Sequence, residues 1–306
     1  IRILQFWMKI VPYQFDEVMK ETIQEFIKIL NEPYEKSVLP TQQSKKSPQA
    51  VILEQRFKAL IGEKDNIHKL ALNNAPKIKY PKISDKKKWR FIDIDSEEIA
   101  RQVTLLHSKI FRKIGVMELL SAIWGSKRGG GSEHVDELTR LFDLLSRYVQ
   151  FSIISEMDKP KNRANLFVKW FDVAVYFEAL KNYHGVFAIM YGLTHRSVQR
   201  MPDTMKIVKK LMKKKQAKYN DLDSLCQLAG NYAKYRPVIE KITPPCVPFI
   251  GCFQKDLIYV QEGFPNTIDG LINFKKCINC VSLIEKVADY QSNRYELQKD
   301  KDLRTI

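Results

Sequence analysis

From Asp95 onward the chain is a succession of amphipathic helical patterns, and this feature restricts it to a helical fold. Apolar residues recur at three- and four-residue spacings, and few segments alternate as a half-buried strand does. Asp95-Ser96-Glu97-Glu98 predicts a helix start, because carboxylates in the first turn favour the positive end of the helix dipole. The patterns predict an all-α fold with helices over 95–112, 116–123, 133–156, 160–181, 184–192, 203–215, 221–241, 248–262 and 271–291.

The chain before Asp95 has a different character. Residues 2–30 have amphipathic helical patterning with a break at Pro12, and residues 33–49 carry Pro33, Pro40 and Pro48. The stretch 73–90 contains prolines and a run of three lysines, which predicts an extended, mobile segment. We therefore expect a helical segment over 1–32, a basic linker over 33–90 and a large helical domain over 91–306.

The formal net charge of +16 is concentrated in two places. Residues 35–90 hold fourteen Lys and Arg against five Asp and Glu, and residues 201–218 hold seven Lys against one acid, Asp203. Such stretches suit an anionic membrane surface, or they are a solvated linker and helix face. Nucleic acid is not expected as a partner, because the basic residues are not interleaved with stacking aromatics.

Motifs for covalent chemistry are absent from the sequence. It has no phosphate-binding P-loop, no dinucleotide-binding glycine motif and no zinc-protease motif, so neither an enzyme nor a bound cofactor is expected. Five cysteines are too few and too odd a set for a disulfide framework. Cys277 and Cys280 form a CxxC that could join Cys246 and Cys252 as zinc ligands, but a continuous helix with buried thiols is the favoured interpretation.

Three blocks together resemble the Ras guanine-nucleotide exchange factor (RasGEF) family, the Son-of-sevenless-like catalytic domain. The first begins with IARQVTLL at 99–106. The second includes FEALKNYHG at 177–185, and the third joins PPCVPFIG at 244–251 to LINF at 271–274. The resemblance covers about residues 91–297. It implies a helical catalytic domain with a protruding helical hairpin, and it identifies 1–32 as the closing part of the family's N-terminal helical domain.

The resemblance also implies a mechanism without bond chemistry. Exchange factors of this family insert the hairpin into the nucleotide site of a small GTPase. Ile258 and Glu262 would be the residues that act. They are four apart and share a helix face. Ile258 would lie where Mg²⁺ binds, and Glu262 would accept a hydrogen bond from the P-loop Ser/Thr that ligates that ion. Glu262 at a helix C-terminus is otherwise electrostatically unfavourable.

Further residues are assigned by the same resemblance to the surface that grips the second switch of the GTPase. For Trp124 and Phe249 the alternative is core packing, and for Arg140 and Asn182 it is an ordinary surface or structural hydrogen bond. The expected GTPase-binding set is Trp124, Arg140, Asn182, Tyr232, Phe249 and Lys255.

Several residues depart from the family pattern. Lys181 and His184 replace asparagines, Asp143 and Tyr148 stand where Asn and Trp are usual, and Lys255 is larger than the common residue. These departures leave the GTPase open among the Ras, Rap and Ral types. Two alternatives remain open: a pseudo-exchange factor that binds a GTPase without releasing nucleotide, and a basic scaffold for anionic membranes. We expect a monomer in the cytoplasm, peripheral at the inner membrane surface, or in the host cell if a bacterium delivers it.

Overall fold

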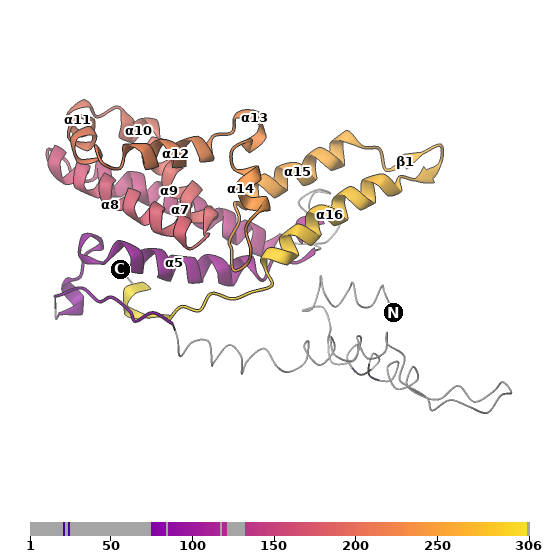
Figure 1. Cartoon of the computed structure of the whole chain (residues 1–306), viewed down its shortest axis with the longest axis horizontal. Helices are drawn as coiled ribbons and strands as arrows, with labels where there is room; N and C mark the ends of the chain where they lie inside the picture. Colours follow the sequence, from indigo (N-terminus) through magenta and orange to yellow (C-terminus); the bar gives the residue numbers. More distant parts are fainter. Residues whose placement is uncertain are drawn as a thin grey trace. The chain divides into compact units, whose positions relative to one another are not determined.

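The computed structural model describes residues 75–83, 85–116, 118–120 and 132–304, together with Glu21 and Gln24. The chain divides into two units, residues 1–74 and 75–306, and the second is described here (Figure 1). The predicted helical segment 1–32, most of the predicted linker, Trp124 and part of the predicted helix 116–123 lie outside the described residues.

Helices make up most of the described part of the second unit, which confirms the all-α prediction. A small antiparallel pair of strands, β1 (Thr267–Ile268) and β2 (Leu271–Ile272), places Thr267 opposite Ile272. The α-helices are α5 (Ser96–Phe111), α7 (Glu133–Ile154), α8 (Pro160–Ala179), α9 (Tyr183–Thr194), α10 (Arg196–Gln199), α11 (Pro202–Leu211), α12 (Gln216–Cys226), α13 (Ala229–Tyr232), α14 (Arg236–Glu240), α15 (Ile250–Gly263) and α16 (Phe274–Tyr290).

Helix α9 is the centre of the hydrophobic core. Almost all of its side chains are buried, and it contacts α5, α7, α8, α10 and α12. Two glycines permit this close packing. A Cβ on Gly185 would lie 2.7 Å from the Phe177 ring of α8, and a Cβ on Gly192 would lie 2.7 Å from Val149 of α7. A helix that is apolar on all sides can be stable only in such an enclosed position.

The two ends of this unit pack beside α5. Trp89, Ile94 and Leu303 form a small buried cluster, so the last part of the predicted linker is ordered against the domain. The side chain of Gln102 donates to the carbonyl of Gln298 at 2.9 Å and accepts from the backbone N–H of Asp300 at 3.0 Å. Helix α5 thus contacts α7, α8 and α9 of the core and, through Gln102, the C-terminal segment.

The helix predicted over 221–241 is wrong, because the structure divides this stretch among α12, α13 and α14. Gly230 and Asn231 adopt left-handed backbone conformations with φ of 59° and 56°. Glycine and asparagine tolerate this region best, so strain arises mainly where the left-handed run continues into Tyr232, with φ of 62°. Pro237 then lies in the first turn of α14, where its missing N–H is not needed.

The cysteines follow the buried-thiol interpretation with one exception. Cys226, Cys246, Cys252 and Cys280 are buried, whereas Cys277 is exposed, and none forms a disulfide. Cys277 and Cys280 belong to the continuous helix α16 and face different surroundings. Among the described residues no three His, Cys, Asp or Glu side chains gather as metal ligands. None of the described helices combines the length and apolarity needed to cross a bilayer.

Two histidines are buried side by side under the start of α9. The rings of His107 and His184 meet edge to face with centroids 5.2 Å apart. Burial lowers the pKa of His107 to about 4, although a hydrogen bond with Asn182 opposes the shift. Burial and the neighbouring His107 lower the pKa of His184 to about 3, against a hydrogen bond to the Leu138 carbonyl. Both imidazoles are therefore neutral in the folded protein near neutral pH.

This pair makes stability depend on pH. Below about pH 6.5 these histidines bind protons in the unfolded chain but not in the folded chain. The free energy of unfolding is therefore highest above that pH and decreases as the pH falls toward 4. At about pH 5 each histidine costs roughly 2 kcal/mol of unfolding free energy relative to pH 7. Denaturant unfolding at the two pH values measures the difference.

His184→Asn should reduce this pH dependence by about half, whatever it does to stability at neutral pH. His195→Asn is the matched control, because it removes an imidazole from the surface and keeps a side-chain acceptor for the Ser197 N–H. An unfolding free energy that is the same at both pH values in the wild-type protein would contradict the neutral buried pair.

Candidate functional site

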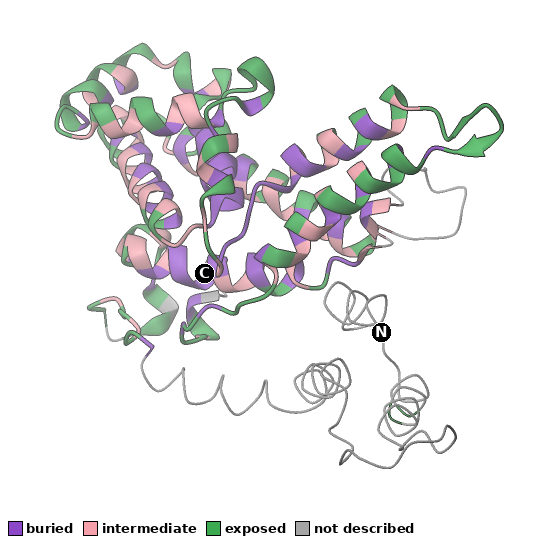
Figure 2. Ribbon diagram, turned by 45° about the vertical axis from the view of Figure 1, so that its right-hand side comes forward, coloured by how far each residue is buried: buried purple, intermediate pink, exposed green. Residues whose placement is uncertain are grey.

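The helices α15 and α16 form a hairpin that leaves the helical body side by side, with β1 and β2 at its far end (Figure 1). Figure 2 shows that this far end is exposed, in contrast to the buried interior of the body. The sequence predicted both helices over nearly these residues. It did not predict the strands, of which β2 occupies the first residues assigned to the second helix.

The hairpin is attached to the core through the segment that precedes α15. The backbone N–H of Val247 donates to the Lys181 carbonyl at 3.1 Å, and the Val247 carbonyl accepts from His184 at 3.2 Å. The N–H of Phe249 donates to the buried Tyr235 hydroxyl at 2.9 Å. These bonds join the start of the hairpin to the turn between α8 and α9, the most enclosed part of the fold.

The Phe249 ring completes this attachment. It is 9% exposed and stacks on Phe187 of α9 with centroids 4.2 Å apart and planes 9° apart. Tyr232 meets it edge to face at 5.6 Å, and Phe142 lies at the same distance. Such aromatic contacts add about 0.5–1.5 kcal/mol each beyond the area they bury. The core-packing alternative therefore describes most of the Phe249 surface.

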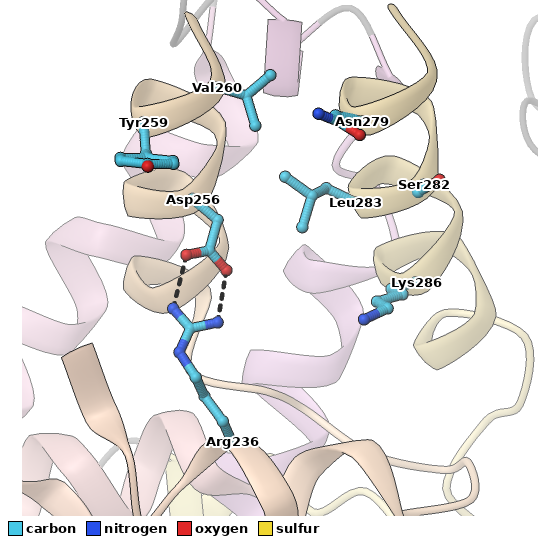
Figure 3. Close-up of a pocket in the computed structure, with 8 residues that line it drawn as sticks. All are labelled: Arg236, Asp256, Tyr259, Val260, Asn279, Ser282, Leu283 and Lys286. Carbon is cyan, nitrogen blue, oxygen red and sulfur yellow. Dashed lines mark hydrogen bonds and ion pairs between the residues drawn. The ribbon is translucent and has the colours of Figure 1, made fainter. Parts of the chain in front are cut away.

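An ion pair fixes one side of the hairpin. The guanidinium of Arg236 in α14 holds the carboxylate of Asp256 in α15 through two hydrogen bonds of 2.7 and 2.6 Å (Figure 3). The Nε of Arg236 also donates to the Asn231 carbonyl at 2.7 Å. The hydrogen bonds to Asp256 raise the pKa of Arg236. This arrangement connects α15 to the interrupted helix segment that carries Tyr232.

A buried lysine fixes the far end of α15. The Lys276 side chain is 6% exposed, and its ammonium donates to the carbonyls of Gln261 and Phe264 at 2.9 and 2.8 Å and to the Asn266 side chain at 2.8 Å. Asn273 caps α16 and donates to the Pro265 carbonyl at 2.9 Å. A cation at a helix C-terminus is favourable, so Lys276 offsets the cost of Glu262 at the same helix end.

Ile258 and Glu262 lie one turn apart on α15 and both are exposed. Ile258 is 42% exposed, and neighbouring Tyr259 is 71% exposed. Within the described part of the chain no hydrogen bond or ion pair engages the Glu262 carboxylate. An aliphatic side chain followed by an unpaired carboxylate is therefore available to a partner near the end of the hairpin.

Of the remaining predicted residues, the structure brings Lys255 and Tyr232 together. The Lys255 ammonium lies 5.8 Å from the centroid of the Tyr232 ring. Tyr232 itself is buried, in a left-handed conformation with φ of 62°. Lys255 is exposed on α15, and Arg140 is exposed on α7. These positions are compatible with a surface beside the hairpin.

Asn182 has a structural role in the protein. It is fully buried, and its side chain caps α9 by accepting from the Gly185 N–H at 3.0 Å. Its amide donates to the Thr104 hydroxyl at 2.9 Å and lies against His107. The alternative of a structural hydrogen bond therefore describes Asn182, and direct contact with a partner does not fit its burial.

Sequence reasoning did not single out Lys276, Arg236 or Asp256. The Asn273-x-x-Lys276 spacing is a cap signal, but nothing local shows that the ammonium turns back toward α15. Arg236 and Asp256 are 20 residues apart, so only the packing of α14 on α15 brings them together. Tyr259, which is next to Ile258 and more exposed, was also not among the predicted site residues.

Comparison with known proteins places this geometry in a family. Residues 98–278, from α5 into α16, match the RasGEF domain. Ras guanine nucleotide exchange factor J of Dictyostelium discoideum is 33% identical over 80% of this chain and 30% of its own length. Ras-specific guanine nucleotide-releasing factor 2 of Danio rerio is 30% identical over 68% of this chain and 17% of its own length. Rap guanine nucleotide exchange factor 1 of Homo sapiens is 26% identical over 69% of this chain and 19% of its own length.

The chain belongs to the RasGEF domain family, as the resemblance of its three blocks predicted. It spans less than a third of the length of each of these relatives. Their names describe exchange or release of guanine nucleotide, which supplies a hypothesis for what the exposed hairpin does.

Removal of the buried ammonium should loosen the hairpin end. Lys276→Met leaves two backbone carbonyls and an amide oxygen without donors, at a local cost on the order of 2–3 kcal/mol. Amide hydrogen exchange over residues 258–276 should therefore become faster, while exchange in α9 stays unchanged. Lys275→Met is the matched control, since Lys275 is the exposed neighbour. Equal exchange in both variants would show that the ammonium does not hold the end of α15.

Proposed function

We propose that this chain is a guanine-nucleotide exchange factor for a small GTPase of the Ras family, and that its hairpin opens the nucleotide site. The observation that carries the proposal is the exposed pair Ile258 and Glu262 on the first helix of a hairpin that projects from the body of a RasGEF domain. The activity is mechanical. GDP leaves unchanged, no covalent bond is made or broken, and the exchange factor supplies no cofactor of its own.

In the proposed mechanism Ile258 takes the space of the GTPase Mg²⁺ ion. The ion is the largest positive charge beside the nucleotide phosphates, so its loss weakens their binding. Glu262 accepts a hydrogen bond from the P-loop Ser/Thr hydroxyl that had ligated the ion, and its carboxylate repels the phosphates. An acceleration of about 10⁴–10⁵ requires a barrier lower by about 5.5–7 kcal/mol, which the loss of a divalent ion and its contacts can supply.

The remaining contacts would grip the second switch of the GTPase. Arg140 and Lys255 offer an exposed guanidinium and ammonium, and the buried Tyr232 would contribute through its ring beside the Lys255 ammonium. Phe249 would act mainly by supporting the hairpin from the core, and Asn182 by holding the turn to which the hairpin is attached. Trp124 remains a proposed contact from the segment before α7.

The main alternative is a pseudo-exchange factor, which would bind a GTPase without releasing its nucleotide. Release of labelled GDP from Ras, Rap and Ral proteins, with a Rho protein as negative control, separates the two. An exchange factor accelerates release from at least one of the first three and forms a stable complex with its nucleotide-free form. A complex without acceleration would support the alternative.

Truncation of the proposed acting residues should slow exchange. Ile258→Ala combined with Glu262→Ala removes the occupant of the metal site and one charge-assisted hydrogen bond, worth about 1.5–3 kcal/mol for the bond alone. GDP release should therefore slow on the order of 10–100-fold. Glu296→Ala, which removes an exposed carboxylate from the C-terminal segment, is the control. Full activity of the double variant would refute the mechanism while leaving the family assignment intact.

The ion pair beside the hairpin should contribute through position alone. Arg236→Met and Asp256→Ala each break the same two hydrogen bonds, so each should slow GDP release roughly 3–10-fold, and the double variant should be no slower than the slower single one. Binding of the GTPase should change less than the release rate, because neither residue is a proposed contact. Additive losses in the double-mutant cycle would show that the two side chains act separately.

A further inference from the structure

The exposed side of α11 is a strip of lysines. Thr204, Val208 and Met212 are buried and lie at four-residue spacing, so one side of the helix packs against the domain. The contact with α8 is fixed by Arg163, whose Nε donates to the Thr204 hydroxyl at 2.8 Å. The opposite side and the turn that follows carry five exposed lysines, Lys206, Lys209, Lys210, Lys213 and Lys214.

These five lysines have no acidic partner among the described residues. The next two lysines along the chain are different, because Lys215 pairs with Asp172 at 2.5 Å and Lys218 pairs with Glu178 at 2.5 Å. The two acidic side chains of α8, Asp172 and Glu178, are therefore already paired and do not neutralise the five lysines. The five remaining ammonium groups, which we call the α11 lysine strip, present an uncompensated positive surface to the solvent.

The chemistry of the strip favours lipid over nucleic acid. Residues 202–214 contain no arginine for bidentate recognition of phosphate and no aromatic ring on which a base could stack. They do contain Leu211, whose side chain is 46% exposed at the edge of the strip. Compact ammonium groups beside an exposed aliphatic side chain suit an anionic bilayer surface.

The strip is also far from the proposed GTPase site. Figure 1 shows α11 and the β1–β2 end of the hairpin at opposite ends of the coloured part of the second unit. A surface that binds at α11 therefore leaves the hairpin free.

We propose that the α11 lysine strip docks this chain on an anionic membrane surface. The docking goes beyond nucleotide exchange and does not depend on it. Where the GTPase is itself held at a membrane, the strip raises the local concentration of the exchange domain without touching the hairpin.

The test is binding of the full chain to phosphatidylcholine vesicles that contain phosphatidylserine. Lys206→Gln, Lys210→Gln and Lys213→Gln in one protein should weaken binding about 100-fold, since each neutralised lysine near the surface accounts for about fivefold. Wild-type binding should fall steeply as salt is raised, and the corresponding triple Lys→Arg protein should bind as wild type does.

The control is a protein with the same charge change on another face. Lys109, Lys299 and Lys301 are exposed on α5 and the C-terminal segment, so their triple Lys→Gln variant should bind vesicles as wild type does. Equal losses in both triple variants would mean that only total charge matters and would overturn the proposal. Binding to RNA that exceeds binding to the anionic vesicles would overturn it as well.

GDP release from a soluble GTPase separates this proposal from the proposed exchange activity. The strip variant should release GDP at the wild-type rate in solution, because its lysines lie outside the hairpin and its supports. Loss of vesicle binding with intact exchange supports the strip. A chain without exchange activity whose vesicle binding still depends on the strip would refute only the exchange proposal.

Discussion

The projecting hairpin depends on one attachment, the backbone pairing of Val247 with the turn between α8 and α9. That turn is held from inside by the buried amide of Asn182, and it begins the most enclosed helix of the domain. The Phe249 ring and the Tyr235 hydroxyl then fix the first residue of the hairpin on the same core. An element that reaches away from its domain can keep a direction only if its root is rigid, and here the root is part of the core.

Beyond the root, polar contacts set the geometry of the hairpin. The Arg236–Asp256 ion pair holds its side, and the Lys276 ammonium closes its end. Each of these groups gives up water for hydrogen bonds of good length, so each is worth little in net stability but much in defined position. Among the described residues, none pairs in a comparable way with the face that carries Ile258 and Glu262. The hairpin is therefore held by internal contacts where it joins its own domain, whereas the side chains of its exposed face are available to a partner.

The sequence predicted the helices better than it predicted the contacts between them. Periodic apolar residues placed α5, α7, α8 and α15 within a few residues, and the acidic first turn marked the start of α5, because those signals are local. The break at Gly230 and Asn231 was missed, since a helical pattern continues on both sides of it. The strands at the hairpin end are too short to produce an alternation.

The site residues divide in the same way. Ile258 and Glu262 were found through family motifs and the four-residue spacing that puts them on one face. The burial of Asn182 and the inward turn of Lys276 were not foreseeable, because a polar residue in a turn or first helical turn is usually solvated and only the tertiary fold shows otherwise. Arg236 and Asp256 carry no signal at all until α14 and α15 are packed together.

Asn182 has one more consequence. Asn182, which caps α9, is next to Lys181, whose carbonyl accepts from Val247 at the base of the hairpin. A substitution of Asn182 would therefore disturb both the packing of the core and the attachment of the hairpin. If such a variant lost the proposed exchange activity, the cause would be a disturbed domain structure and not the loss of a direct contact between Asn182 and a GTPase. In domains of this architecture, a polar residue that matters for function can do so from the inside.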